Sequence, residues 1–198
     1  MNKTIVFFDF DGTITTKDSL LDFIKYYHGN IKLTLGLFFL TPILLLYKMN
    51  IISNYKAKEI LLRYFFEGVY VNTFKNIARE YSLNKIDEIL NTDAIKKLNW
   101  HKELNHEIIV VSASIECWIQ DWCTKNNIKL ISTKLEIINF KLTGKLKGKN
   151  CYGIEKVNKI NCEYNLKVYD NIYVYGDSNG DKEMLALASK GKGFFKCF

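Results

Sequence analysis

Two aspartates follow directly on a short apolar run near the start of the chain, and this arrangement constrains the fold more than any other feature. The run, residues 4–8, consists of β-branched and aromatic residues that favour a buried strand. Asp9 and Asp11 stand at its end, and Gly12 permits a sharp turn. Two carboxylates so close repel each other, and burying them is costly unless a cation or several donors compensate. The pattern favours a site in which one carboxylate is a nucleophile, the other an acid and base, and a divalent ion holds both. An Asx-type turn with solvated aspartates is the alternative.

Two further strand-like runs end in polar residues in the same way. Residues 171–175 lead to Asp177 and Asp181, and residues 107–111 run straight into Ser112. A helical pattern follows each of these runs, which is typical of an open parallel sheet. Ligands bind such sheets outside the carboxyl ends of the strands. We therefore expect these side chains and the N-terminal aspartates to gather at one edge of the sheet.

Taken in chain order, the motifs resemble the signature of the haloacid dehalogenase (HAD) superfamily. They are Asp9-x-Asp11-Gly12-Thr13, Ser112 after a strand, Gly153-Ile154-Glu155-Lys156-Val157, and Gly176-Asp177-x-x-Gly180-Asp181. Their spacing is most similar to the phosphoserine-phosphatase-like branch, in which a helical cap is inserted between the first and second motifs. The resemblance covers essentially the whole chain. It implies an α/β fold, with a Rossmann-like parallel sheet core formed by residues 1–17 and 92–198 and an all-helical cap domain at 18–91.

The resemblance also implies catalytic roles. Asp9 resembles the nucleophile that attacks phosphorus and forms an aspartyl-phosphate, which splits hydrolysis into two easier steps. Asp11 resembles the general acid that protonates the leaving oxygen and then the base that activates water. Ser112 would hydrogen-bond the phosphoryl group, and Lys156 would neutralise charge on it and on Asp9.

A magnesium ion is implied as well, because a site of carboxylates, waters and a phosphate oxygen is its usual environment. The implied metal-binding residues are Asp9, Asp11 through its backbone carbonyl, Asp177 and Asp181. Asp181 is either a direct ligand or an anchor for a metal-bound water or for Lys156. Gly12, Thr13, Ala113 and Asp18 are assigned to substrate binding.

The expected activity is Mg²⁺-dependent hydrolysis of a phosphomonoester on a small phosphorylated metabolite. Phosphoserine phosphatases of this branch carry a cap glutamate where this chain has Asp18, which helix capping explains equally well. They also carry a cap arginine, for which Arg63 is the nearest candidate, and glycines where this chain has Ala113 and Ser114. A dehalogenase has no use for an acid at Asp11. A phosphomutase keeps both acids and remains an alternative, as does a phosphatase specific for phosphoserine.

Residues 33–47 are nearly all apolar and are flanked by Lys32 and Lys48. A helix needs about 20 apolar residues to span a membrane, and Pro42 is expected to kink or break this one. We therefore expect a buried cap helix or a homodimer contact. Large apolar patches also mark interaction sites, so a membrane-surface contact, in a lipid-phosphate phosphatase or a membrane-associated binding module, is the alternative.

Periodicity and turn residues predict the remaining elements. Strands are expected near 4–8, 107–111, 128–132, 171–175 and 193–197, and cap helices at 20–27, 31–47, 54–66 and 71–81. Ser114 is expected to cap the helical pattern that starts at Ile115. Residues 141–149 are expected to form a solvated hairpin around Gly144.

Composition bounds the remaining possibilities. The 198 residues are 48% hydrophobic, enough for one α/β core with a small inserted domain. Five scattered cysteines without a C-x-x-C pair indicate reduced thiols, and the three histidines lack metal-ligand spacing. The net charge is +7, but the lysines are spread along the chain, so no nucleic-acid partner is expected. No signal peptide is visible, and we expect a cytoplasmic protein.

Overall fold

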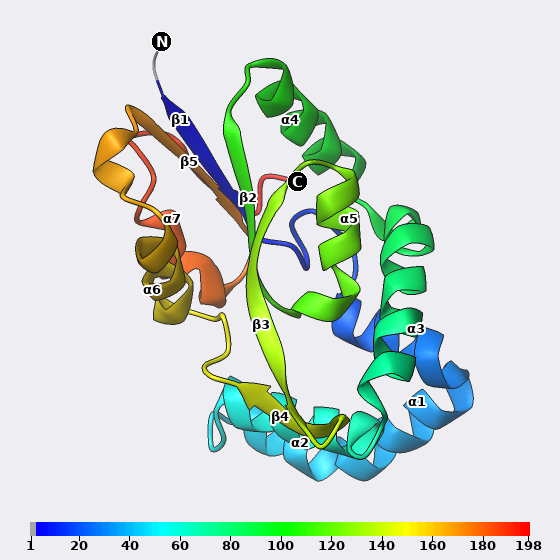
Figure 1. Ribbon diagram of the computed structural model, residues 1–198. Helices are drawn as coiled ribbons and strands as arrows, with labels where there is room; N and C mark the ends of the chain where they lie inside the picture. Colours follow the sequence, from blue (N-terminus) through cyan, green and yellow to red (C-terminus); the bar gives the residue numbers. More distant parts are fainter. Residues whose placement is uncertain (1–2) are drawn as a thin grey trace.

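The computed structural model describes residues 3–198 and has a six-stranded sheet at its centre (Figure 1). The strands are β1 (Thr4–Phe8), β2 (Glu107–Ile115), β3 (Lys129–Ile138), β4 (Lys141–Lys147), β5 (Asn171–Gly176) and β6 (Gly193–Phe195). They lie in the order β4-β3-β2-β1-β5-β6, and all neighbours are parallel except β3 and β4. The predicted α/β class with a mostly parallel sheet is confirmed.

Helices cover both faces of this sheet. They are α1 (Ser19–Lys48), α2 (Asn54–Phe66), α3 (Val71–Asn84), α4 (Thr92–Glu103), α5 (Gln120–Lys125), α6 (Ile154–Glu163) and α7 (Lys182–Leu185). Alternate residues of β1 point to opposite faces. Ile5 and Phe7 pack with residues of α6 and α7, whereas Val6 and Phe8 belong to the larger cluster built with α1 to α5. Figure 1 shows α6 and α7 on one side of the sheet and α4 and α5 on the other.

The position of β1 fixes where a site can form. It lies between β2 and β5, so the chain winds outward from β1 in one direction through β2 and β3 and in the other through β5 and β6. Its last residue, Phe8, is paired with Val110 on one side and Tyr175 on the other. The carboxyl ends of β1 and β5 therefore flank a topological switch point, where open α/β sheets bind ligands.

The element α1 contains the two helices predicted for this region, because a kink divides it between the predicted ranges. It runs from Ser19 to Lys48 with one non-helical residue, Gly29, at φ 80° and ψ 169°. Pro42 lies inside the helix, and the expected break there is wrong. Pro42 is exposed, so the carbonyl that its ring leaves unpaired can be solvated, and the helix continues.

The apolar part of α1 is not the buried cap helix that was expected. Within residues 33–47 only Gly36 and Leu40 are buried, while Phe38 is 72% exposed. Gly36 lies against α2 so closely that a Cβ atom there would be 2.3 Å from Cζ of Phe65. Contact with the rest of the protein is thus confined to one side of the helix. By length and composition, α1 is the one helix within residues 3–198 that could cross a membrane, a test that core helices and signal sequences also pass.

The predicted hairpin turn is misplaced. The two-residue turn lies between β3 and β4, at Asn139 and Phe140, which both have positive φ as a type I′ turn requires. The hairpin is also only partly solvated, because Leu142 and Leu146 are buried. Gly144 lies within β4 and packs against α2.

The segment between α2 and α3 is joined to this hairpin by backbone hydrogen bonds. The Gly68 N–H donates to the Leu142 carbonyl at 2.8 Å, and the Val71 N–H donates to the Phe140 carbonyl at 2.9 Å. The helices α1 to α3 thus rest on a strand of the sheet as well as on each other. The domain division at residues 18 and 91 stays a prediction.

Candidate active site

A buried ion cluster lies at the carboxyl end of β1. The Nζ atom of Lys156 is 2.5 Å from Oδ1 of Asp9 and 2.6 Å from Oδ1 of Asp181, and it donates to the Val111 carbonyl at 2.8 Å. All three charged side chains are buried. Burial alone would lower the pKa of Lys156, but the two carboxylates outweigh it and raise this pKa, so the lysine stays charged.

The lysine reaches the cluster because α6 starts beside the loop that follows β5. Gly153 precedes the helix with a positive φ of 61°, and its N–H donates to the Gly180 carbonyl at 2.9 Å. A Cβ atom on Gly180 would be 2.3 Å from the ring of Tyr152, so glycine permits this close approach. The first turn of α6 is therefore held against the sheet, with Lys156 directed at the end of β1.

Asp177 joins this cluster from the end of β5. Carboxylate oxygens of Asp9, Asp177 and Asp181 lie within 4.8 Å of one another. Gly12 has a φ of +79°, and a Cβ atom there would be 2.3 Å from Oδ2 of Asp177. The hydroxyl of Thr13 donates to Oδ1 of Asp177 at 3.3 Å. The loop after β1 therefore positions the carboxylate that follows β5.

Both oxygens of Asp181 are engaged by protein donors. Oδ1 accepts from Lys156, while Oδ2 accepts from the Ser178 N–H at 3.0 Å, the Ser178 hydroxyl at 2.7 Å and the Asp177 N–H at 3.3 Å. Of the two roles that the sequence left open for Asp181, this arrangement favours the anchor of Lys156 and of the loop over a direct metal ligand.

The remaining carboxylates fit a divalent cation. Burial raises the pKa of Asp9 to about 7 although Lys156 opposes the shift, and burial together with Asp181 raises the pKa of Asp177. One lysine thus compensates these acids incompletely. Mg²⁺ prefers oxygen ligands supplied by one or two carboxylates. Asp9 and Asp177 are the residues that would hold it, and the backbone carbonyl of Asp11 stays a predicted ligand.

Asp11 is held by groups that the sequence did not suggest. The hydroxyl of Ser114 donates to Oδ2 of Asp11, and the Ser19 N–H donates to Oδ1 at 2.8 Å. The two serine hydroxyls are 2.7 Å apart, and Nε1 of Trp118 donates to Ser19 at 3.2 Å. Burial, with Asp18 adding to it, raises the pKa of Asp11 to about 6.

The prediction that Ser114 caps a helix is therefore wrong. β2 continues through Ile115, and a 3₁₀ turn at Glu116–Trp118 precedes α5. The pairing of β2 with β3 is irregular between Val111 and Ile115, and both Ser112 and Ser114 line the same cleft. Ser112 accepts from the Ser114 N–H at 3.0 Å. No regular strand alternation passes through this irregular stretch, so the sequence carried no clear signal for Ser114.

A cleft of about 410 Å³ opens in front of these residues. The catalytic candidates Asp9, Asp11, Ser112 and Lys156 line it, together with Ala113 and Asp18. Its other wall is formed mainly by apolar side chains of α1 and α2, namely Leu20, Leu21, Leu44, Ala57 and Leu61, with Tyr47 beside them. Gly12, Thr13 and Asp177 contact one another and are not part of the cleft lining. Asp18 also caps α1, because its carboxylate accepts from the Leu21 N–H at 3.0 Å.

Lys58 of α2 is the cation that the helices contribute to this cleft. Its Nζ donates to the Ala113 carbonyl at 2.9 Å and to Oδ1 of Asn150 at 3.3 Å. Burial lowers the pKa of Lys58, and Asp11 opposes this shift. Arg63, the candidate suggested by the sequence, is instead exposed and lies 3.8 Å from Glu67. Lys58 had no signal in the sequence, because nothing distinguishes it from the other lysines.

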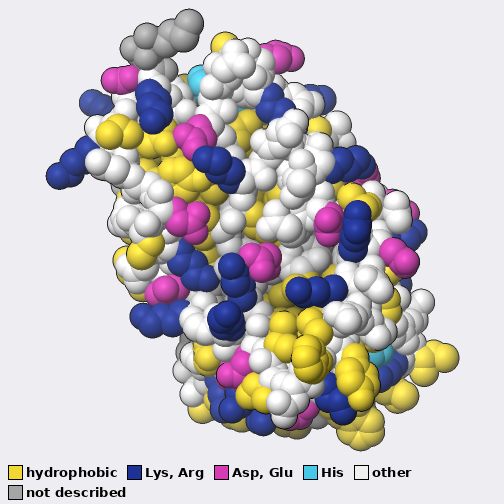
Figure 2. Space-filling model, in the orientation of Figure 1, with side chains coloured by type: hydrophobic (Ala, Val, Ile, Leu, Met, Phe, Trp, Pro, Cys, Tyr) yellow, Lys and Arg dark blue, Asp and Glu magenta, His cyan; other side chains and the backbone are white. Residues whose placement is uncertain are grey.

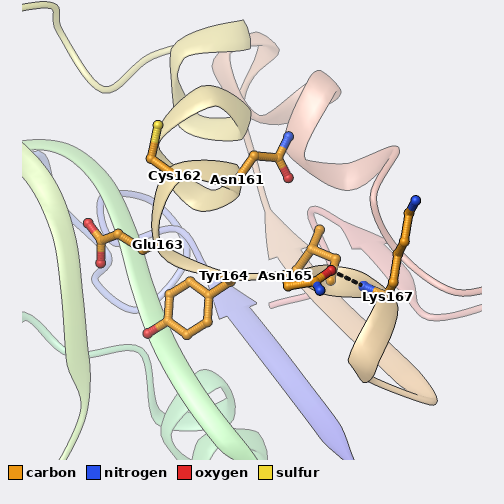
Figure 3. A pocket seen from close by; sticks show the side chains of 7 residues that line it. Asn161, Cys162, Glu163, Tyr164, Asn165 and Lys167 are labelled. Carbon is orange, nitrogen blue, oxygen red and sulfur yellow. Dashed lines mark hydrogen bonds between the residues drawn. The ribbon is translucent and has the colours of Figure 1, made fainter.

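A second hollow, of about 530 Å³, lies at the end of α6 (Figure 3). Residues 161–167 alone line it, and the hydrogen bond drawn there joins the Lys167 N–H to the Asn165 side chain. The side chains of Cys162 and Glu163 point in different directions (Figure 3). Because its lining residues come from one short segment and do not converge, we assign the chemistry to the cleft at β1.

Comparison with known proteins agrees with this geometry. A model of the haloacid dehalogenase-like hydrolase family matches residues 6–186. Protein CicA of Caulobacter vibrioides (strain NA1000 / CB15N) is 31% identical over 192 residues, which are 96% of this chain and 85% of CicA.

Two solved structures share the fold. One is a protein of unknown function from Bordetella pertussis Tohama I, with a TM-score of 0.80, 18% identity, and coverage of 95% of this chain and 88% of that one. The other is a phosphoserine phosphatase, solved as a phospho-aspartyl intermediate analogue, with a TM-score of 0.60, 18% identity, and coverage of 95% and 84%.

Proposed function

The chain belongs to the haloacid dehalogenase-like hydrolases, and we propose that it hydrolyses a phosphomonoester with Mg²⁺, through an aspartyl-phosphate formed on Asp9. One observation carries the proposal. The buried carboxylate of Asp9 ends the central strand, is held by Lys156, lies beside Asp177, and lines the cleft. The phosphoserine phosphatase of the same fold was solved as an analogue of a phospho-aspartyl intermediate, which supports this chemistry.

The proposed reaction has two steps. In the first, a carboxylate oxygen of Asp9 bonds to phosphorus, the ester P–O bond breaks, and Asp11 gives its proton to the leaving oxygen. In the second, Asp11 takes a proton from water, the water oxygen bonds to phosphorus, and the Asp9–phosphorus bond breaks to release inorganic phosphate. Lys156 and Ser112 stabilise the phosphoryl charge, and bound Mg²⁺ would add a further positive charge at the phosphoryl oxygens.

The leaving group is a small phosphorylated metabolite in this proposal, and the cleft contains features of two more specific substrates. Asp18 and Lys58 place opposite charges at the cleft, which suits the ammonium and carboxylate of phosphoserine. Leu20, Leu44 and Leu61 form an apolar wall, which suits a lipid-like leaving group. A phosphate-ester screen with phosphoserine, sugar phosphates, nucleotides and lysophosphatidic acid distinguishes these classes. Release of inorganic phosphate, rather than an isomerised product, distinguishes a phosphatase from a phosphomutase.

The test of the mechanism is turnover of p-nitrophenyl phosphate. Asp9→Asn is expected to lower kcat by more than about a thousandfold, because an amide is a poor nucleophile and brings no charge to the metal. Asp11→Asn is expected to slow turnover and accumulate phosphoenzyme, because water activation is lost. Asp93→Asn, an exposed carboxylate paired with Lys96, is the control and should keep full activity. Full activity in Asp9→Asn, or in excess EDTA, would overturn the mechanism.

A further inference from the structure

One side of α1 carries large apolar side chains with little protein contact. Ile31, Leu35, Phe38, Phe39, Leu45 and Met49, here called the outer face of α1, are between 52% and 79% exposed. Ile31, Leu35, Phe38, Leu45 and Met49 follow the helical repeat and form one stripe. At about 1.5 Å per residue this stripe is about 27 Å long. Figure 2 shows hydrophobic side chains gathered along the lower edge of the molecule, the end where Figure 1 places α1, α2 and the β3–β4 hairpin.

The charged residues in the stretch that contains the outer face all have one sign. Residues 23–58 contain five lysines and no aspartate or glutamate. Four of these lysines, Lys25, Lys32, Lys48 and Lys56, are exposed. A helix with a continuous apolar side that includes phenylalanine and leucine, bounded by lysines, is typical of segments that lie in the interface of an anionic membrane.

We infer that the outer face of α1 docks onto the surface of an anionic lipid bilayer. Its phenylalanine and leucine side chains enter the boundary between headgroups and acyl chains, and the exposed lysines pair with lipid phosphates. The catalytic cleft opens beside this surface, because Leu44 and Tyr47 of the same helix line it. The inference concerns a binding surface and does not depend on the proposed reaction.

The lysines also argue against a second copy of the chain as the occupant. A two-fold contact brings the same patch of both copies together. Here it would place four exposed lysines of one copy close to the same four of the other, with no acid within residues 23–58 to offset them. Anionic lipid supplies the missing negative charge.

Two contacts argue for docking on the membrane rather than crossing it. Gly36 packs against Phe65 of α2, and Leu40 is buried in the main core cluster. Moving α1 into the bilayer would break both contacts and would remove Leu44 and Tyr47 from the cleft. A helix that lies in the interface keeps its inner side on the protein.

The experiment is co-sedimentation of the full chain with vesicles. Vesicles of phosphatidylcholine with about a third phosphatidylglycerol are expected to bind the protein, and to bind it less at high salt, because the lysines contribute through screened charge. Vesicles of phosphatidylcholine alone are expected to bind it more weakly. No binding to the anionic vesicles would overturn the inference.

A pair of matched variants locates the surface. Phe38→Glu combined with Leu45→Glu is expected to weaken binding to anionic vesicles by more than about tenfold. The variant loses two apolar side chains that would enter the bilayer, and its new carboxylates are repelled by the anionic lipid. The control combines Leu104→Glu with Val168→Glu, which are 49% and 51% exposed and lie outside α1. It carries the same charge change and should lose much less binding. Equal losses in the two double variants would show that net charge alone acts.

Three readouts keep the outcome decisive. Thermal unfolding by circular dichroism should be similar in the two double variants, so that a loss of binding is not a loss of fold. Sedimentation without lipid should show a monomer, and a dimer abolished only by the Phe38 and Leu45 changes would assign the face to a second copy. Protein that stays with vesicles after an alkaline carbonate wash would cross the bilayer, which would overturn surface docking.

Discussion

The catalytic edge and the outer face of α1 solve opposite physical problems. At the catalytic edge, formed by Asp9, Asp11, Ser112, Lys156, Asp177 and Asp181, polar side chains are held by hydrogen bonds from the protein itself. Among residues 3–198, the buried side-chain polar atom without a partner is Oγ of Ser132, which is on β3 and outside this group. On the outer face of α1, large apolar side chains are exposed to solvent.

This difference separates two kinds of information in the chain. In the proposed reaction, the residues of the catalytic edge recognise a phosphoryl group and its metal, which are common to many substrates. They say little about the leaving group, which must be distinguished by residues that contact it. Side chains of α1 and α2 line the cleft in front of the catalytic edge, and α1 also carries the outer face. We therefore expect the helices between β1 and β2 to determine the specificity, and the residues at the edge of the sheet to carry out the proposed reaction.

The largest expected effect comes from removing the lysine of the catalytic edge. Lys156→Met leaves the buried carboxylates of Asp9 and Asp181 without their cation. We expect turnover to fall by more than about a thousandfold and the free energy of unfolding to fall by about 3–5 kcal/mol, because breaking a buried ion pair leaves an uncompensated charge. Urea unfolding and p-nitrophenyl phosphate turnover measure the two effects.

The control for this variant lies on the same helix. Lys159 donates to the Ser132 carbonyl at 2.8 Å and contacts none of the acids of the catalytic edge. Lys159→Met should therefore leave turnover within about twofold of the unchanged protein and lower stability by about 1 kcal/mol. Similar losses in the two variants would mean that Lys156 has no special place at the catalytic edge.

The second prediction compares two leucines of α1 that lie five positions apart, one in contact with the protein core and one exposed to solvent. Leu40 is 8% exposed and Leu45 is 54% exposed. Leu40→Ala is expected to lower the free energy of unfolding by about 2–3 kcal/mol, because it removes buried methyl groups and leaves a cavity. Leu45→Ala is expected to change it by less than about 0.5 kcal/mol. A large loss in Leu45→Ala would show that the outer face stabilises the fold in solution.

Local patterns in the sequence specify that the side chains of the catalytic edge lie close together. Asp9 and Asp177 each follow an apolar strand and a glycine stands next to each of their turns, so both the strand and the turn could be identified from neighbouring residues. Parallel strands then bring these turns to one edge. The roles assigned to the individual residues remain predictions.

The parts that sequence reasoning missed depend on packing between distant segments. Ser114 was assigned to a helix cap because serine favours that position, but β2 continues past it to Ile115, which pairs with Thr133 of β3 after an irregular stretch. Lys58 reaches the cleft because α2 packs across it from β2, where Lys58 donates to the Ala113 carbonyl. The exposure of Phe38 could not be predicted either, because an apolar helix segment has the same sequence pattern whether protein, lipid or water covers it.

The smallest expected effect concerns Lys58, where the two regions meet. Its ammonium lies at the cleft and donates a hydrogen bond to the Ala113 carbonyl. It is the one cation that α2 contributes to the lining. Lys58→Gln removes this charge but keeps a hydrogen-bond donor. For an anionic substrate we expect KM to rise about fivefold to tenfold, the effect of about 1 kcal/mol of lost attraction. We expect kcat to stay within about twofold, because Lys58 does not contact Asp9 and acts on substrate binding rather than on the phosphoryl transfer.

The rise in KM should shrink at high salt, where the attraction is already screened, whereas Lys58→Arg should keep most of the affinity. Steady-state kinetics at two ionic strengths measure both constants. An equal fall of kcat and kcat/KM would instead place Lys58 in the chemistry of the catalytic edge and remove the division of labour between sheet and helices.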